Sequence, residues 1–196
     1  MNLADIYYRL AELDMARKTY TTALQAAQQG TAERSWNIHI LQRMADIDMQ
    51  RLDWKRAVRV FEQIRTLSPE DSESRKSLID LNFKLGNKSQ GLRELDNYTS
   101  YLAEHPSEEN DIVELIKNLL NDHPSIAQVH RILAEQYYRL GNKDEAIKEF
   151  DNAAEMFLEA GDKEQAVKTI TMLLSIKPAN SEEYQQVLAS IQADGQ

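Results

Sequence analysis

The sequence contains no cysteine and few helix-breaking residues, with six glycines and four prolines among 196 residues. Without cysteine the chain can form neither disulfides nor thiolate metal sites, and a reducing compartment suits it. No apolar run approaches the roughly 20 residues that cross a bilayer, and no basic stretch with an apolar core marks a signal peptide at the start. A formal net charge of −9 argues against binding to nucleic acid or to an anionic membrane, because both require clustered Lys and Arg. We therefore expect a cytoplasmic protein that binds neither.

Apolar residues at helical spacing are abundant, and the glycines and prolines lie almost entirely between the periodic segments. Helix ends are expected at four glycines, where a left-handed residue costs least: Gly30, Gly86, Gly141 and Gly161. N-caps are expected at five polar residues: Asp53, Ser107, Ser125, Asn142 and Asp162. Together these signals predict helices at 2–10, 13–29, 32–51, 53–67, 72–85, 88–104, 108–121, 125–140, 143–159, 162–176 and 181–192.

One pattern of packing residues recurs along the chain: a small residue, a large one four positions later, and a further packing residue three after that. Its occurrences are Ala16-Tyr20-Ala23, Ala57-Phe61-Ile64, Gly91-Leu95-Tyr98, Ala146-Phe150-Ala153 and Ala166-Ile170-Leu173. This spacing places the three residues on one helical face, with the small residue where a neighbouring helix comes closest. An ordinary helical bundle does not predict such a recurrence.

The pattern resembles the tetratricopeptide repeat (TPR), which has an Ala-x3-Phe core, an upstream Leu-Gly-x2-Tyr and a closing proline. The segment from Leu133 through Ala146 to Phe150 matches it best, and the resemblance covers nearly the whole chain. It implies an all-α fold: an α-α superhelix, or TPR-like solenoid, of antiparallel helical hairpins.

The distances between the recurring small residues predict how the repeats are organised. Residues 1–105 are expected to form three TPR-like hairpins with an insertion at 31–37, which would make the helix containing Trp36 unusually long. Residues 106–124 would form an extra bridging helix. Because Ala146 and Ala166 are only 20 residues apart, helix 143–159 would belong to two hairpins, so that 125–178 would form overlapping hairpins. Residues 179–196 would be a cap helix or the start of a further repeat, as in a segment of a longer polypeptide.

Catalytic and cofactor-binding motifs are missing from the sequence, including phosphate loops, His-Glu-x-x-His, calcium loops and Gly-x-Ser-x-Gly. The histidines lie in separate segments, and surface or turn positions are expected for them, since a metal site needs three or four convergent ligands: His39, His105, His123 and His130. Adjacent carboxylates at helix starts interact favourably with the helix dipole, and nothing indicates a cleft that would adapt them for acid–base chemistry. We expect no enzymatic activity, no cofactor and no metal.

The resemblance implies a peptide-binding groove on the inner face, formed by the first helix of each hairpin. Aligning the hairpins gives an acidic row on this face: Asp5, Asp46, Asp80 and Glu135. Ion pairs four residues apart would account for its charges: Asp5–Arg9, Asp80–Lys84 and Glu135–Arg139. They do not account for the apolar or aromatic residue beside each acid, which favours a binding surface. The candidate partner-binding residues are Trp36, Asp46, Met49, Asp80, Phe83, Lys84, Arg131, Glu135, Tyr138 and Arg139.

The sequence therefore predicts a non-enzymatic scaffold or adaptor whose partner is a protein or peptide. The acidic row favours a neutral or basic segment with apolar anchors, and it would repel the carboxylate that some chaperone-binding members of the family hold. The alternative is a ligand- or peptide-sensing regulatory domain of a larger signalling protein.

Overall fold

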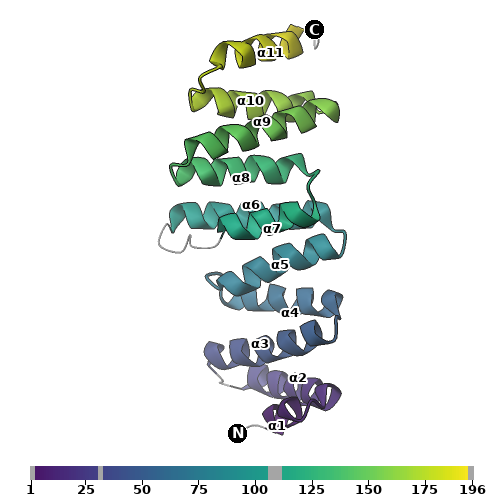
Figure 1. The fold of residues 1–196 in the computed structure, drawn as a ribbon. Helices are drawn as coiled ribbons and strands as arrows, with labels where there is room; N and C mark the ends of the chain where they lie inside the picture. The colour runs from purple at the N-terminus through teal and green to yellow at the C-terminus, as the bar shows by residue number, and fades with distance from the viewer. Residues whose placement is uncertain (1–2, 31–32, 106–111, 194–196) are drawn as a thin grey trace. The chain divides into compact units, whose positions relative to one another are not determined.

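The computed structural model describes residues 3–30, 33–105 and 112–193, and in these ranges the chain consists of helices and turns without a strand (Figure 1). The helices are α1 (Leu3–Arg9), α2 (Leu13–Gln29), α3 (Arg34–Gln50), α4 (Trp54–Leu67), α5 (Ser72–Lys84), α6 (Lys88–Glu104), α7 (Ile112–Asp122), α8 (Ala127–Arg139), α9 (Lys143–Glu159), α10 (Lys163–Ser175) and α11 (Ser181–Ala193). The expected helix starts at residues 2, 32 and 108 lie outside the described residues, and the other expected limits agree to within two residues. The prediction of an all-helical repeat solenoid is confirmed.

The chain divides into two compact units, residues 1–95 and 96–196, and the division falls within α6. In the first unit, each of the helices α1 to α4 packs against the helix that follows it. The second unit repeats this order from α7 to α11. Packing between sequence neighbours is what makes each unit a helical repeat array.

The recurring small residues lie at close contacts, as their spacing predicts. Ala16, Ala57, Ala146 and Ala166 have no exposed surface, and Gly91 in α6 is buried as well. The tightest contact is at Gly91, where an added Cβ would lie 2.7 Å from Cδ2 of Phe83 in α5. The Phe83 ring thus fills the space that a side chain at position 91 would need.

Five hairpin turns share one backbone geometry, in the connections α1–α2, α3–α4, α5–α6, α8–α9 and α9–α10. In each of them an amide donates to the carbonyl five residues earlier, at 2.8 to 2.9 Å, and the residue before that amide has a positive φ. This is the Schellman type of helix ending. Glycine takes the positive-φ position in three turns: Gly86, Gly141 and Gly161. Ala11 and Leu52 adopt the same conformation with a side chain, at φ 58° and 57°.

The helix caps agree with the sequence at some positions and differ at others. Asp53 and Asp162 cap α4 and α10, each accepting from a backbone amide at 3.2 Å. Asn142 is at the N-cap of α9 but makes no cap hydrogen bond through its side chain. The expected cap at Ser125 is wrong: α8 begins after Ile126, whose side chain is buried, so apolar packing and not a polar cap fixes this end. The expected cap at Ser107 lies outside the described residues.

Two further expectations about helix ends and lengths are wrong. Helix α2 ends at Gly30 as expected, but Gly30 is extended, with φ −97°, and not left-handed. Helix α3, which contains Trp36, has 17 residues, four more than α5 or α8 but the same as α2, α6 and α9. It is therefore not unusually long.

Candidate partner-binding face

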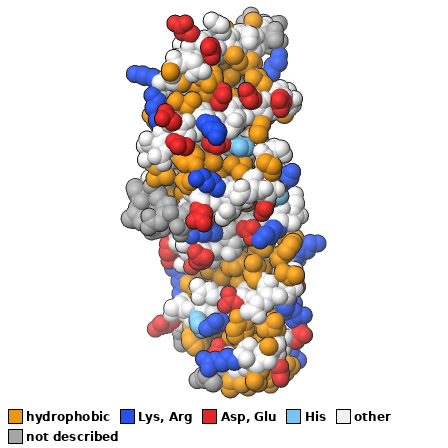
Figure 2. Space-filling view, in the orientation of Figure 1, with side chains coloured by type: hydrophobic (Ala, Val, Ile, Leu, Met, Phe, Trp, Pro, Cys, Tyr) orange, Lys and Arg blue, Asp and Glu red, His pale blue; other side chains and the backbone are white. Residues whose placement is uncertain are grey.

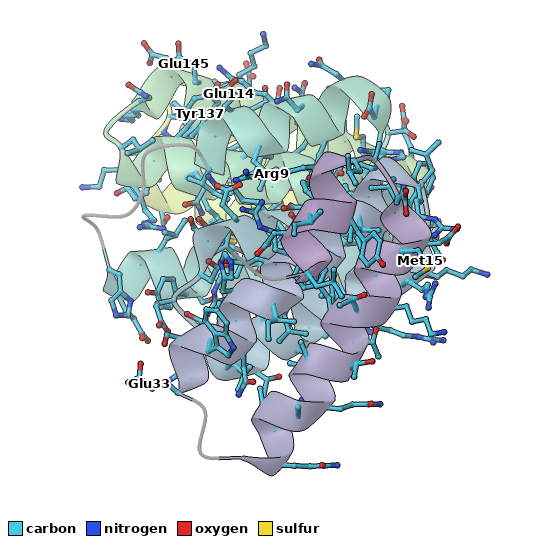
Figure 3. All side chains as sticks on the ribbon, turned by 90° about the horizontal axis from the view of Figure 1, so that it is seen from below. Arg9, Met15, Glu33, Glu114, Tyr137 and Glu145 are labelled. Carbon is cyan, nitrogen blue, oxygen red and sulfur yellow. The ribbon has the colours of Figure 1, made fainter. Side chains whose placement is uncertain are left out.

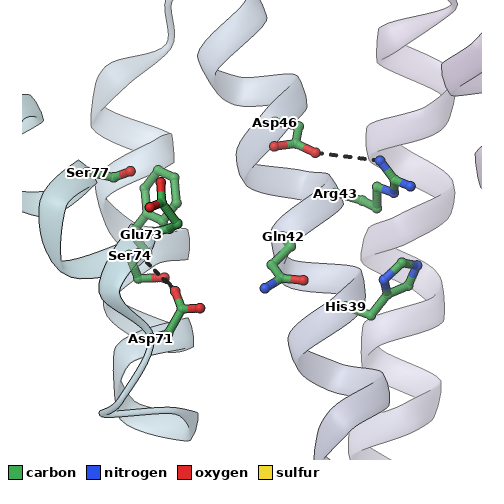
Figure 4. A pocket seen from close by; sticks show the side chains of 9 residues that line it. His39, Gln42, Arg43, Asp46, Asp71, Glu73, Ser74 and Ser77 are labelled. Atoms are coloured by element: carbon green, nitrogen blue, oxygen red, sulfur yellow. Dashed lines mark hydrogen bonds and ion pairs between the residues drawn. The ribbon is translucent and has the colours of Figure 1, made fainter. Parts of the chain in front are cut away.

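Two adjoining pockets lie on the surface formed by α1, α3 and α5 in the first unit, which we call the first-helix face. The α1–α3 pocket has a volume of about 380 Å³ and is lined by Asp5, Tyr8, Arg9, His39 and Arg43. The α3–α5 pocket has a volume of about 470 Å³ and is lined by His39, Gln42, Arg43, Asp46, Phe61, Asp71, Glu73, Ser74 and Ser77 (Figure 4). The two pockets meet at α3, since His39 and Arg43 line both.

The polar stripe of α3 follows from helical spacing. Trp36, His39, Arg43 and Asp46 recur at intervals of three or four residues, which places them on one face of the helix. The other side of α3 is apolar and buried in the core of the first unit: Ile40, Leu41, Met44, Ala45 and Ile47. Trp36 is 50% exposed and its ring stacks on that of His39, with centroids 5.9 Å apart. A large aromatic surface thus lies beside the pockets.

Arg43 of α3 contacts α1 near the centre of the face. Its guanidinium lies 5.6 Å from the centroid of the Tyr8 ring in α1, within the range of a cation–π interaction. The Tyr8 hydroxyl accepts from Nε2 of Gln50 at 2.7 Å, which links α1 to the end of α3. An Nη1 to Oδ2 distance of 3.7 Å separates Arg43 from Asp46, too long for a hydrogen bond.

The remaining charges of the α1–α3 pocket are Asp5 and Arg9. Asp5 accepts from the Tyr20 hydroxyl at 2.5 Å, and burial together with this hydrogen bond raises the pKa of Tyr20. The Asp5–Arg9 ion pair expected from the sequence is not formed, and no carboxylate in the described ranges pairs with Arg9. In Figure 3, Arg9 lies on the side of α1 opposite Met15. The pocket therefore has two guanidinium groups and one carboxylate.

The α3–α5 pocket is acidic. Burial raises the pKa of Asp46, and Arg43 partly opposes the shift. Asp71 caps α5 by accepting from the amide of Ser74 at 2.9 Å, and Glu73 pairs with Lys76 at 3.4 Å. Three carboxylates line this pocket, with the Arg43 guanidinium at its boundary (Figure 4).

The candidates on α5 and at the end of α3 have different surroundings. Asp80 and Lys84 form the expected ion pair, at 2.7 Å. Met49 is half-buried. The prediction that Phe83 offers an aromatic contact to a partner is wrong: it is 3% exposed, because its side of α5 faces α6 and its ring packs on Gly91.

The candidates in the second unit all lie on α8. Glu135 accepts from Arg131 at 2.6 Å instead of forming the expected pair with Arg139. Burial raises the pKa of Glu135, and Arg131 opposes this. Arg139 donates to Oε1 of Gln136 at 2.9 Å, while Tyr138 is 51% exposed. Tyr138 is therefore the aromatic side chain that α8 presents to solvent.

His130 does not occupy the surface or turn position expected from its sequence. Its Nδ1 lies 2.6 Å from Oε2 of Glu149, and its Nε2 lies 3.0 Å from the carbonyl oxygen of Pro124. Both ring nitrogens face acceptors, which suits a protonated imidazole, and the hydrogen bond to the Glu149 carboxylate raises the pKa of His130. His130 thus joins α8 to α9, and among the described residues no three His, Asp or Glu side chains gather to hold a metal.

His39 and Arg43 are members of the face that were not predicted from the sequence. The signal was available, since both stand at helical spacing from Asp46. Aligning the hairpins in single rows hid this signal, because a pocket between two helices uses several turns of each. The charged and apolar side chains are interspersed on the side of the molecule seen in Figure 2.

Comparison with known proteins identifies the repeats. Family models of the tetratricopeptide repeat match the sequence over residues 1–29 and 113–157. The chain therefore contains tetratricopeptide repeats in these two segments, as the sequence pattern predicts. Repeats of this family generally mediate protein–protein interaction. No curated protein matches the chain.

Several solved structures resemble this one at low sequence identity. A crystal structure of MamA is 17% identical, with a TM-score of 0.44, and the match covers 83% of this chain and 98% of MamA. A tetratricopeptide repeat protein from Parabacteroides merdae is 17% identical, with a TM-score of 0.42 and coverage of 97% and 82%. The apo form of RapI is 13% identical, with a TM-score of 0.46 and coverage of 98% and 66%. In the described part of the chain, every helix is too short or too polar to span a membrane.

Proposed function

We propose that this chain is a non-enzymatic scaffold or adaptor, and that its first-helix face binds a segment of a partner protein. The observation that carries this proposal is the pair of adjoining pockets joined at His39 and Arg43. Pockets that continue across three helices suit an extended segment, because successive side chains of the segment can enter successive pockets.

Aromatic groups at this face supply the contact energy. Trp36 is half exposed and is already oriented by its stack on His39, so its side chain loses little entropy when a partner packs on it. Exposed aromatics of this kind dominate many interfaces. Met49 adds a flexible apolar contact. On α5, the Asp80–Lys84 pair extends the polar border of the face.

The second unit offers a comparable set of groups on α8. Tyr138 stands beside Arg139, and the Arg131–Glu135 pair lies on the preceding turn. We include these four residues as candidate contacts for a second part of the partner. The proposal also includes the organisation expected from the sequence: hairpins in 1–105, a bridging helix in 106–124, overlapping hairpins in 125–178 and a further helix in 179–196. It also includes action in the cytoplasm without nucleic acid or membrane, which the net charge of −9 supports.

An affinity capture with a mutated face tests this function. Wild-type chain and the variants Trp36→Ala and Arg43→Ala are immobilised and exposed to an extract of the source organism, and bound proteins are identified by mass spectrometry. Glu62→Ala on α4 serves as the control, because Glu62 is exposed and lines neither pocket of the face. Proteins lost with both face variants but retained by the control are partners, and their binding segment is mapped with overlapping peptides.

The loss of affinity in the Trp36→Ala variant tests whether this face binds the partner. Trp36→Ala should weaken binding of the mapped segment by about 2 kcal/mol, or about thirtyfold in Kd, as for an aromatic anchor. Circular dichroism should show the helix content of each variant unchanged. Partners that bind both face variants as tightly as the wild type would refute the assignment of this face.

A further inference from the structure

The two pockets of the first-helix face carry opposite charge. In the α1–α3 pocket, Arg9 and Arg43 outnumber Asp5, and the Asp5 carboxylate is engaged by the Tyr20 hydroxyl. Arg9 has no ion-pair partner within the described residues. The guanidinium of Arg43 has donors to spare, because its 3.7 Å separation from Asp46 exceeds a charge-assisted hydrogen bond. This pocket therefore favours an anionic side chain.

On the other side of α3, the α3–α5 pocket has the opposite net charge. Asp46, Asp71 and Glu73 line the α3–α5 pocket, and Arg43 is the cation that it shares with its neighbour. The Asp46 carboxylate is not hydrogen-bonded to Arg43 at 3.7 Å, and Glu73 and Lys76 are 3.4 Å apart on the solvent side. A cationic side chain that entered this pocket would meet at least one carboxylate without a close hydrogen-bonding partner.

We propose that the segment bound by the first-helix face is dipolar, with an acidic side chain in the α1–α3 pocket and a basic side chain in the α3–α5 pocket. This inference rests on the proposed function, and it replaces the neutral or basic segment expected from the acidic row. A uniformly acidic or uniformly basic segment places a like charge in one pocket, which disfavours it. Charge order along the segment therefore sets its direction of binding.

The geometry also sets the spacing of the two charges. The pockets share His39 and Arg43, so their centres are separated by about the width of one helix, roughly 10 Å. An extended chain advances about 3.3 Å per residue, which places the acidic and basic residues about three positions apart. Long side chains reach one position further on either side.

Selection from a random peptide library tests this pattern. Twelve-residue peptides displayed on phage are selected on the full chain, and enriched peptides are synthesised and titrated by calorimetry at low and high salt. The expected peptides carry an acidic and a basic residue about three positions apart in one fixed order. Their affinity should fall at high salt.

Matched charge removals assign each residue of the peptide to its pocket. Arg9→Gln and Glu73→Gln should each weaken binding by up to about fivefold, the upper end of the range for an exposed ion pair. Replacing the peptide's acidic residue with Gln should abolish the effect of Arg9→Gln but keep that of Glu73→Gln, and replacing its basic residue should do the reverse. Arg59→Gln and Glu62→Gln on α4 are the controls and should leave affinity unchanged, since both residues line a different groove, between α2 and α4.

Three results would overturn the inference. Enriched peptides of uniform charge, or with the two charges in either order, contradict the dipolar pattern. Affinity that depends on Trp36 but shows no coupling to Arg9 or Glu73 contradicts it too, while the proposed binding face stands. If no enriched peptide loses affinity with Trp36→Ala, the proposed face and the dipolar pattern fail together.

Discussion

Replacing Gly91 with alanine sets helix propensity against packing, and the structure predicts which effect is larger. Gly91 lies in the first turns of α6, where alanine would ordinarily stabilise a helix by about 1 kcal/mol. Its Cβ, however, would lie 2.7 Å from Cδ2 and 2.8 Å from Cε2 of Phe83. Carbon atoms in contact prefer about 3.5–4.0 Å, so the overlap is close to 1 Å at two ring atoms.

The Phe83 ring cannot move aside cheaply, because it is 3% exposed and packed in the core of the first unit. Overpacking of this kind costs about 1–3 kcal/mol, which exceeds the gain in propensity. We expect Gly91→Ala to lower the free energy of unfolding by about 0.5–2 kcal/mol. The melting temperature of a chain of this size should fall by about 1–8 °C.

Urea denaturation and thermal unfolding, followed by circular dichroism, measure the effect, and a double-mutant cycle assigns its cause. In a Phe83→Leu background the shorter side chain can turn away, so Gly91→Ala should become neutral or stabilising. A coupling free energy of about 1 kcal/mol or more is expected between the two sites. If Gly91→Ala stabilises the chain with Phe83 in place, the argument that Phe83 excludes a side chain at position 91 is wrong.

Three further predictions concern other parts of the fold. Leu52→Gly should stabilise the chain by up to about 1 kcal/mol in urea denaturation, because Leu52 is 71% exposed with φ 57°, while Leu52→Ala, which keeps the unfavourable conformation, should not. Asp48→Ala should lower the free energy of unfolding by about 3–5 kcal/mol, since Asp48 is 1% exposed and accepts three hydrogen bonds of 2.9–3.1 Å from Arg17. The double variant Arg17→Met with Asp48→Leu should restore most of this stability, and a double variant as unstable as Asp48→Ala would contradict the prediction. Glu149 raises the pKa of His130 in the folded chain. The resulting stabilisation of the second unit should be complete below the unfolded pKa of about 6.5 and should decline as pH rises through the folded pKa. The stability difference between wild type and His130→Gln should therefore shrink with increasing pH. A difference that does not vary from pH 5 to 9 would show that Glu149 does not raise the pKa of His130.

The helices could be predicted from the sequence because their determinants are local. Apolar spacing, capping carboxylates such as Asp53 and turn glycines such as Gly86 act within a few residues of one another, so one sequence suffices to detect them. The cap of α8 was mispredicted because burial of Ile126, a tertiary contact, outweighed the local preference of Ser125 for a cap.

The candidate site could be predicted only in part, because a pocket between helices depends on how each helix is rotated about its axis. Asp46 was identified from its position in the repeat and Trp36 from its place in the insertion outside the repeat pattern, and both lie on or beside the first-helix face. Phe83 was identified as the aromatic residue beside one of the acids, but its ring packs into the space that Gly91 leaves on α6. The choice of Glu135 between Arg131 and Arg139 is likewise made by side-chain packing, since both cations stand four residues away on one helix.

The identical turns at the two ends of α9 bear on how such an array evolves. Because the turns before and after α9 share one backbone geometry, a single helix with its turn, about twenty residues long, can serve as a module. Loss or duplication of such a module keeps every junction intact, yet it exchanges inward- and outward-facing roles for all helices downstream. A short genetic event in this region could thus move a whole set of side chains from a hidden surface to a binding surface without a single substitution.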